Sequence, residues 1–128
     1  MSPENERAHD ASVDAVRAAV QRYVDGCVAA DPAVVRDAFT SDAVMWGYLG
    51  PDYVTMSGTD FAANVVGTAQ PAGAEYAAEI HGIVVTGSVA HAVLEERQFL
   101  GANFRNEFGL ILRDGAWRIA SKIFTTVD

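Results

Sequence analysis

The C-terminal half of the chain consists of long segments with β-strand character separated by tight-turn signals. The segments cover residues 76–86, 88–100, 103–113 and 116–127. The last two are separated by Asp114-Gly115, and an Asp-Gly pair between two alternating apolar runs is the strongest short-range hairpin signal. This half of the sequence therefore predicts long antiparallel hairpins, which form a sheet when they pair side by side.

The N-terminal half has helical periodicity instead. Residues 1–11 are polar and are expected to form a disordered leader, after which Ser12 is a suitable N-cap for a first helix. The apolar residues of this helix recur three and four positions apart on one face: Val13, Val16, Val20, Tyr23 and Cys27. Asp31 and Pro32 favour a second, short helix that ends near residue 39.

The segment between the halves mixes strands with one more helix. Alternation at residues 42–49 and a shorter run at 53–57 predict two strands, and a third helix is expected over residues 60–68. The expected fold is α+β, with three helices from the N-terminal half packed on one face of a strongly bent antiparallel sheet. A sheet bent in this way around its helices has the shape of a cone and is expected to enclose a pocket at its open end. Residues 12–128 are expected to form a single domain.

Composition excludes several classes of partner. The formal net charge is −8 with nine scattered basic residues, so neither a nucleic-acid partner nor an anionic membrane partner is expected. No apolar run is long enough to cross a bilayer, and the polar N-terminus lacks a signal-peptide core, which favours a cytoplasmic location. The lone Cys27 fits a reducing compartment. No metal-ligand spacing is present, and no metal or other cofactor is expected.

Four short segments resemble members of the nuclear transport factor 2-like superfamily: VQRYV, FTSDAV, SGT and LRDGAWRIASKIF. The resemblance spans the chain after residue 12 and includes the ketosteroid isomerase-like, polyketide cyclase-like and putative lumazine-binding branches. It implies the same cone-shaped fold. It does not imply one activity, because this scaffold carries isomerases, cyclases, dehydratases, hydrolases and proteins without catalysis.

The resemblance to ketosteroid isomerases extends to one catalytic position. Tyr23 matches the first-helix tyrosine that donates a hydrogen bond to the developing enolate oxygen in that family. The general-base aspartate of the family falls on Gly47, and its second acid falls near Gly109. Proton transfer next to a carbonyl needs an acceptor. The chain is therefore not expected to be a classical ketosteroid isomerase.

The final hairpin supplies a second group of candidates. A two-residue turn at Asp114-Gly115 pairs Glu107 with Lys122 and places Arg105 and Phe124 on the same face. This face either lines the pocket or lies on the surface, where Glu107 and Lys122 would form an exposed ion pair. Periodicity alone does not distinguish the two arrangements.

Further candidates flank the turn at Gly101-Ala102. The turn brings Glu95 or Glu96 opposite Glu107, with Arg105 diagonal to them, and paired carboxylates in a dry site form an acid–base couple. The alternative is a solvated, charged hairpin end. His81 follows Glu79 on one face of a strand, either as an acid–base group or as a hydrogen-bonded rim residue. Trp46, Tyr48 and Phe61 are aromatic candidates for a ligand-stacking wall, or else for ordinary core.

These residues predict a protein with a small-molecule pocket. The expected function is a cofactor-independent acid–base enzyme, an isomerase, cyclase or dehydratase, acting on a hydrophobic carbonyl- or hydroxyl-bearing molecule such as a polyketide or steroid-like compound. Its catalytic residues would be Tyr23, Glu107, Glu95, His81 and Lys122; its binding residues would be Trp46, Tyr48, Phe61, Arg105 and Phe124. The alternatives are a non-catalytic binder of a flat hydrophobic or heterocyclic ligand and a plain dimerisation domain. A homodimer through the sheet is expected in each case.

Overall fold

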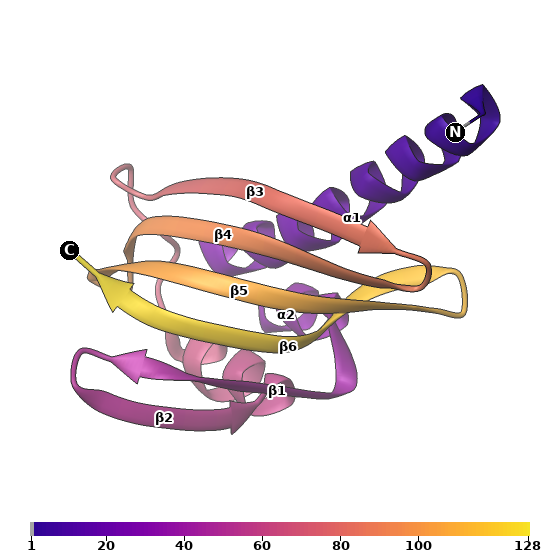
Figure 1. The fold of residues 1–128 in the computed structure, drawn as a ribbon. Helices are drawn as coiled ribbons and strands as arrows, with labels where there is room; N and C mark the ends of the chain where they lie inside the picture. Colours follow the sequence, from indigo (N-terminus) through magenta and orange to yellow (C-terminus); the bar gives the residue numbers. More distant parts are fainter. Residues whose placement is uncertain (1) are drawn as a thin grey trace.

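The computed structural model describes residues 2–128, and it begins with a helix longer than the sequence predicted. Helix α1 runs from Pro3 to Ala29, and the Ser2 side chain caps it by accepting from the Asn5 amide. Ser12, the expected N-cap, lies within the helix and donates to the Ala8 carbonyl. Residues 3–11 are therefore helical rather than a disordered leader, and Met1, the first residue of that leader, lies outside the described residues. The exposed N-terminal part of α1 projects beyond the sheet (Figure 1).

The second helix packs directly against the first, as the short link between them predicted. Helix α2 (Pro32–Ala38) is capped by Asp31, whose carboxylate accepts from the amides of Ala33 and Val34. A Cβ added at Gly26 of α1 would lie 2.6 Å from a Val35 methyl carbon. The absence of a side chain at Gly26 therefore permits the close approach of the two helices.

The third helical segment covers residues 58–68 and changes its winding along its length. It begins with α3 (Gly58–Asp60), continues as a π-helical turn over Phe61–Val65 and ends with a 3₁₀ turn over Val66–Thr68. The Ser57 hydroxyl caps its first turn. Phe61, Ala62 and Val66 are buried, so one face of this segment belongs to the core.

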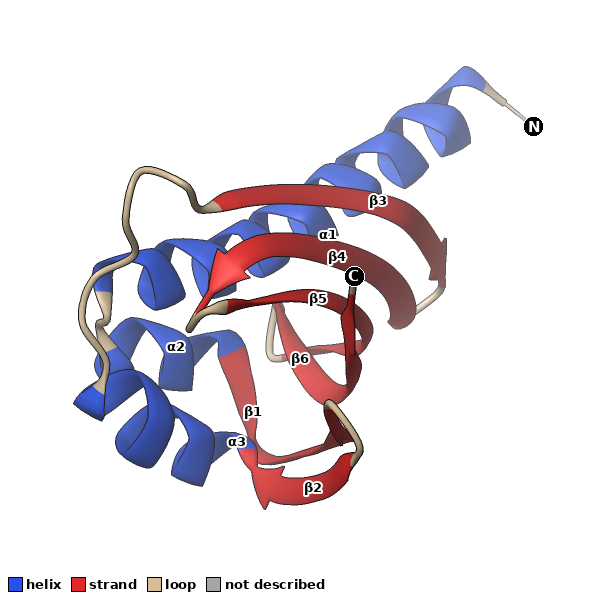
Figure 2. Ribbon diagram, turned by 90° about the vertical axis from the view of Figure 1, so that its left-hand side faces the viewer, coloured by secondary structure: helices blue, strands red, loops and turns tan. Residues whose placement is uncertain are grey.

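Six strands form one sheet with the order β2-β1-β6-β5-β4-β3. Their bounds are β1 Phe39–Leu49, β2 Asp52–Ser57, β3 Ala77–Thr86, β4 Val89–Phe99, β5 Ala102–Arg113 and β6 Ala116–Val127. The three helical segments lie on one side of the curved sheet (Figure 2). All neighbours are antiparallel except β1 and β6, which run parallel, so the sheet is mixed rather than wholly antiparallel. The reason is topological. Residues 58–76 carry the chain from β2 to the far edge of the sheet. The β3–β6 meander then crosses back, and its last strand, β6, lies beside β1 and runs in the same direction as β1.

The inner face of the sheet and the helices share one core. From α1 it takes Val16, Val20 and Tyr23, which are fully buried. From the sheet it takes residues that alternate along each strand with outward-facing ones: Ala92, Leu94, Phe104, Phe108, Leu110, Ile119 and Phe124. No helix in the described chain combines the length and the apolar character that a membrane crossing requires.

The final hairpin has the predicted turn but not the predicted register. Asp114 and Gly115 both have positive φ, and Arg113 pairs with Ala116 as expected for a two-residue turn. A β-bulge at Ala120 then inserts one extra residue into β6, because Leu110 pairs with Ile119 while Gly109 pairs with Ser121.

The bulge reverses which side chains of β6 face the core. Beyond it, Lys122 pairs with Phe108, and Glu107 pairs with Ile123. The predicted pairing of Glu107 with Lys122 is therefore wrong, because one extra residue moves every following side chain to the opposite face. Lys122 and Phe124 point inward, and Ile123 is 57% exposed.

The hairpin of β4 and β5 has neither of the two predicted registers, which placed Glu95 or Glu96 opposite Glu107. Its two-residue turn is Leu100-Gly101, and Phe99 pairs with Ala102. An irregularity between Glu96 and Phe99, with Gln98 at positive φ, shifts the ladder by one residue. Neither glutamate of β4 lies opposite Glu107, because the turn at Leu100-Gly101 already sets a different register, and the shift then makes Val93 the partner of Glu107. Glu95 instead pairs with Arg105, and Glu96 pairs with Phe104.

Candidate functional site

A cavity of about 90 Å³ lies between the third helical segment, the β1–β2 hairpin and the inner face of β4, β5 and β6. Its wall is mostly apolar: Met45, Leu49, Val54, Met56, Phe61, Val65, Phe99, Leu100, Phe104 and Phe124. Three polar side chains complete the wall, namely Glu96, Asn106 and Lys122. Leu49 and Leu100 are half-exposed, so the mouth lies between the β1–β2 and β4–β5 turns.

Lys122 places a buried amine at this cavity. It is the only lysine in the sequence, and it is 4% exposed. Its Nζ donates to the Tyr23 hydroxyl oxygen at 2.7 Å and lies 4.4 Å from the ring centroid of Phe61 and 5.0 Å from that of Phe124. Burial lowers the pKa of Lys122 from 10.5, and the negative charge of Glu96 opposes this effect. The desolvated amine is thus more acidic than a surface lysine.

Tyr23 holds Lys122 from the side opposite the cavity. Its ring is fully buried and contacts the rings of Phe39, Phe61 and Phe108. It does not line the cavity itself but is joined to the cavity wall by the hydrogen bond from Lys122. Burial, with the neighbouring Cys27 and Glu96, raises the pKa of Tyr23 well above 10. The hydroxyl therefore stays neutral.

Glu96 supplies a carboxylate to the same cavity. It is 2% exposed, and its two oxygens accept hydrogen bonds from the Tyr76 hydroxyl and from the Asn106 side-chain amide, both at 2.8 Å. No ion-pair partner lies within 4 Å of it among residues 2–128. Two neutral donors replace the water that a carboxylate would otherwise bind. Desolvation and the adjacent carboxylate raise the pKa of Tyr76 above its ordinary value, so this donor keeps its proton.

Asn106 leaves one acceptor unused. Its Nδ2 donates to Glu96 and to the Leu94 carbonyl, and these two acceptors fix the orientation of the amide. The remaining Oδ1 is buried and has no hydrogen-bond partner among the described residues. An unpaired buried acceptor costs about 1–3 kcal/mol. A ligand with an N–H or O–H group would satisfy it.

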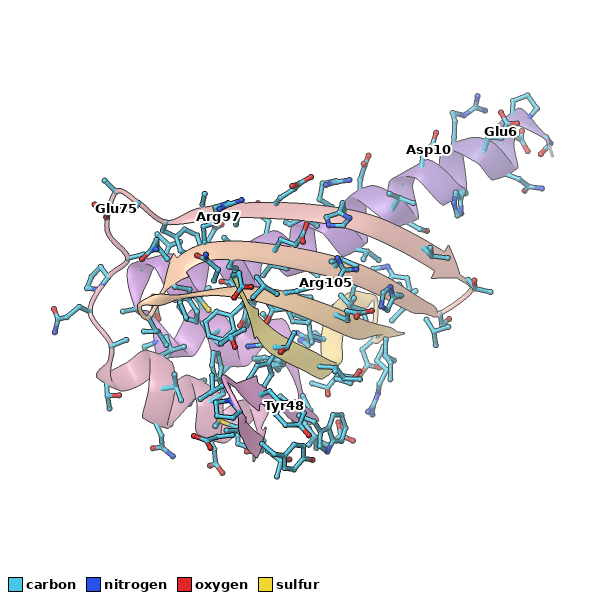
Figure 3. All side chains as sticks on the ribbon, turned by 60° about the vertical axis from the view of Figure 1, so that its left-hand side comes forward. Glu6, Asp10, Tyr48, Glu75, Arg97 and Arg105 are labelled. Carbon is cyan, nitrogen blue, oxygen red and sulfur yellow. The ribbon has the colours of Figure 1, made fainter. Side chains whose placement is uncertain are left out.

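The structure brings four of the sequence-predicted site residues together and places the others elsewhere. Lys122, Phe61 and Phe124 line the cavity, and Tyr23 lies directly behind Lys122. The other six lie on the outer face of the sheet, away from α1: His81, Glu95, Arg105, Glu107, Trp46 and Tyr48. Figure 3 locates Arg105 and Tyr48 on this face.

The outer-face charges form an exposed network. Arg105 lies 3.6 Å from Glu95 and 3.9 Å from Glu107, so it contacts both carboxylates, although these do not pair with each other as expected. His81 contacts Glu95 at 2.9 Å, and His91 contacts Glu107 at 3.4 Å. All five side chains are about 40–50% exposed, so each pair contributes about 0–1 kcal/mol to stability. These side chains are in contact with solvent, as in a surface ion-pair network, and do not form a dry acid–base site.

Trp46 and Tyr48 border a shallow hollow of about 250 Å³ on the same outer face, together with Tyr53, Arg105 and Glu107. Between them in sequence lies Gly47, the residue that the resemblance to ketosteroid isomerases matches to the base of that family. A Cβ at Gly47 would lie 2.2 Å from the Phe124 carbonyl oxygen, so the close approach of β6 excludes any side chain there. The missing aspartate is thus a packing requirement of this chain.

Sequence reasoning missed Asn106 and Tyr76 as site residues and considered Glu96 only as a partner of Glu107 at the hairpin end, either in a dry acid–base couple or in solvent. A signal for Asn106 was present, since it alternates with Phe104 and Phe108 on an apolar strand face. Glu96 follows Ala92 and Leu94 with the same period. No arrangement of three or more histidine, cysteine or carboxylate side chains suited to a metal ion occurs in the part of the chain that the structure describes.

Solved structures share this architecture over nearly the whole chain. A protein from Shewanella baltica OS155, described as nuclear transport factor 2-like and of unknown function, is 26% identical with a TM-score of 0.76, covering 100% of this chain and 98% of that one. A similarly described protein from Methylobacillus flagellatus KT is 23% identical with a TM-score of 0.82, at 100% and 96% coverage. A ketosteroid isomerase-like protein from Erwinia carotovora atroseptica SCRI1043 is 23% identical with a TM-score of 0.69, at 91% and 96% coverage.

The family assignment comes from the sequence match. No curated protein matches the chain at a significant level. The sequence model of one protein family, described as "Putative lumazine-binding", matches residues 11–125, which is most of the chain. The nuclear transport factor 2-like fold expected from the four short segments is confirmed. The chain belongs to the putative lumazine-binding family and has the nuclear transport factor 2-like fold.

Proposed function

We propose that this protein binds a small, largely apolar molecule bearing a carbonyl or hydroxyl oxygen in the cavity beneath its helices, and that it catalyses a cofactor-independent acid–base reaction on that molecule. One observation supports this proposal above the others. A buried amine, Lys122, and a buried carboxylate, Glu96, line the same apolar cavity without forming a direct ion pair. A hydrogen-bond donor and a proton acceptor held apart in a dry site can act on a substrate between them.

Each polar group has a distinct task in this proposal. Lys122 donates to the ligand oxygen and stabilises the negative charge that develops there, and Tyr23 fixes the position of the amine. Glu96 removes or returns a proton at the carbon next to the carbonyl. Asn106 Oδ1 accepts from a ligand N–H or O–H. Isomerisation, cyclisation and dehydration all use this combination of an electrophilic donor and a base.

Glu96 replaces the bases expected from the sequence. Glu107, Glu95 and His81 lie on the outer face, across the sheet from the cavity, so none of them reaches a ligand held beside Lys122. The size of the cavity also limits the ligand. A cavity of about 150 Å³ holds benzene, so 90 Å³ admits a ligand portion smaller than that, and a longer ligand must extend through the mouth.

The second candidate is a binder without catalysis. The family description supports it directly, since a flat heterocycle with N–H and carbonyl groups would satisfy Asn106 Oδ1 and the Lys122 amine at once. Such a ligand requires the Leu49 and Leu100 turns to separate, because a bicyclic ring is larger than the cavity. Binding without turnover distinguishes this candidate from the enzyme.

The test uses pent-4-en-2-one, a small ketone whose isomerisation to the conjugated enone is followed by ultraviolet absorbance. The enzyme proposal predicts turnover by the full chain and a loss of about 100-fold or more in both Glu96→Gln and Lys122→Met. Glu6→Gln on the projecting end of α1 is the matched control, and it should retain the full rate. No turnover by the parent protein, together with saturable binding of lumazine that Lys122→Met abolishes, would instead establish the non-catalytic binder.

We also propose that the protein is a homodimer through the outer face of the sheet. This face exposes Trp46, Tyr48 and Ile123 next to the oppositely charged Arg105 and Glu107. A two-fold contact places the same patch on both subunits, so it requires a surface that is complementary to itself. An apolar centre flanked by both signs of charge meets this requirement.

A further inference from the structure

The Lys122 amine has the surroundings of a nucleophile as well as those of a hydrogen-bond donor. We propose that Lys122 forms a covalent imine with a small aldehyde or ketone held in the cavity. The inference rests on the proposed function only in that the same cavity admits a carbonyl compound. It goes further, because hydrogen bonding of a carbonyl oxygen leaves the amine unchanged, whereas imine formation makes the lysine part of the reacting system.

Nucleophilic attack requires a neutral amine with a free electron pair, and the surroundings of Lys122 favour this state. The groups that face it are the Tyr23 hydroxyl, the Cys27 thiol and the Glu96 carboxylate, together with aromatic rings. No carboxylate of the described chain lies within 4 Å of the amine to hold it as a salt-bridged cation. Burial lowers the pKa of Lys122, so the neutral fraction at a given pH is larger than for a surface lysine.

The use of lysine in this chain supports the inference independently. Eight of the nine basic residues are arginines, and the only lysine is the one buried at the cavity. Arginine is the stronger partner for carboxylates and stays protonated in proteins. Lysine is the basic side chain that loses its proton on burial and adds to carbonyls. A cation with only a structural role at this position would not need to lose its proton or to add to a carbonyl.

The reaction balances without any external oxidant or reductant. The Nζ electron pair adds to the carbonyl carbon, and the electrons of the C=O π bond move to oxygen, which gives a carbinolamine after proton transfer from nitrogen to oxygen. Protonation of that hydroxyl lets the C–O bond break, one water leaves, and the nitrogen electron pair forms the C=N bond. Glu96, on the same cavity wall, is placed to carry these protons.

The cavity also suits the product. A protonated imine is a cation, and it would lie where the Nζ now lies, over the Phe61 and Phe124 rings, which attract a positive charge. The apolar wall limits the access of water that would hydrolyse the C=N bond. The protonated imine would withdraw electrons from the adjacent carbon, and Glu96 would then remove a proton from it more readily than from the parent ketone.

The experiment treats the full chain with propanal and sodium cyanoborohydride and locates the reduced adduct by mass spectrometry. The N-terminal amine is the only other amine and serves as an internal reference. Alkylation blocks the tryptic cut after Lys122, so the modified residue lies in the peptide 119–128. We expect an adduct on this peptide that forms faster at pH 7 than on Nα-acetyl-lysine, because the lowered pKa of Lys122 raises the neutral fraction of its amine. Glu96→Gln should slow trapping by at least about tenfold, and Glu6→Gln should not change it.

Two further measurements separate this inference from the proposed function. Lys122→Met and Lys122→Arg should both lose the adduct on peptide 119–128 while the N-terminal adduct persists. Binding of propan-2-ol, which resembles acetone but forms no imine, is followed by NMR shifts of the Met45 and Met56 methyl groups at the cavity. Propan-2-ol binding without any Lys122 adduct would overturn the imine and leave the cavity proposal intact. If propan-2-ol does not bind and Lys122 gives no adduct, both proposals fail.

Discussion

The Lys122 amine donates a hydrogen bond of 2.7 Å to the Tyr23 hydroxyl, and the two residues lie 99 positions apart in the sequence. Both are buried, and the Phe61 ring lies against both. The bond joins the first helix to the last strand across the core. It explains why a tyrosine occupies the apolar face of α1: the phenol is the hydroxyl partner of the only lysine in the chain.

Removing this hydroxyl should destabilise the protein and lower the pKa of Lys122 further. Tyr23→Phe keeps the ring contacts with Phe39 and Phe108 but leaves the amine without its acceptor. We expect a loss of about 1–3 kcal/mol in the free energy of unfolding, measured by urea denaturation. Tyr53→Phe, at an exposed position, is the control and should change stability by less than about 0.5 kcal/mol. Equal effects of the two changes would contradict the role assigned to Tyr23.

The stability of the protein should depend on pH through Lys122. Its pKa in the folded state lies below the unfolded value of 10.5, so between these two values the unfolded chain binds more protons. The free energy of unfolding therefore rises with pH through this window, and the cost of burying the cation is fully present only below the folded pKa. We expect parent stability, relative to Lys122→Met, to increase as the pH rises towards 10.5.

The comparison with Lys122→Met isolates this contribution. The pKa of Cys27 is raised to about 12, so Cys27 favours unfolding as the pH rises above its usual 9.0, and Tyr23 and Tyr76 act in the same direction at higher pH. All three are present in both proteins, so their effects largely cancel in the difference. A difference in unfolding free energy that is flat or falls over this range would show that Lys122 is not desolvated in the folded protein.

The outer face should be the place where two copies associate. Ile123→Glu introduces a carboxylate at the centre of the exposed apolar patch, and its desolvation opposes association. We expect sedimentation velocity to show a dimer for the parent and a monomer for this variant. Ala18→Glu makes the same charge change on the helix side and should leave the dimer unaffected. A monomeric parent at all concentrations, or a dimer that survives Ile123→Glu, would exclude this interface.

Local sequence signals gave correct predictions where local chemistry decides the structure. The Asp31 cap, the Asp114-Gly115 turn and the alternation of the long strands act over a few residues, so they are legible without the fold. The start of α1 was placed too late because Ser12 resembles an N-cap, although Ser2 followed by Pro3 is an equally good one. Both are valid local signals, and nothing in the sequence ranks one above the other.

The site residues were harder to predict because two bulges decide which side chains face inward. The irregularity near Gln98 and the bulge at Ala120 each insert one residue, and neither has a glycine or proline to mark it. Counting residues across an unbulged hairpin therefore paired Glu107 with Lys122 and placed both on one face. In the structure the same two residues lie on opposite faces of the sheet, one exposed and one buried.

The sequence by itself determined the α+β architecture, the order of its elements and the resemblance to the superfamily, because periodicity, caps and turns are local properties of the chain. The tertiary structure decided which polar residues share a dry cavity. That outcome depends on strand register, and register depends on how the sheet curves and packs beneath the helices. Glu96, Asn106 and Lys122 come from three different strands, and only the folded sheet brings them to one wall.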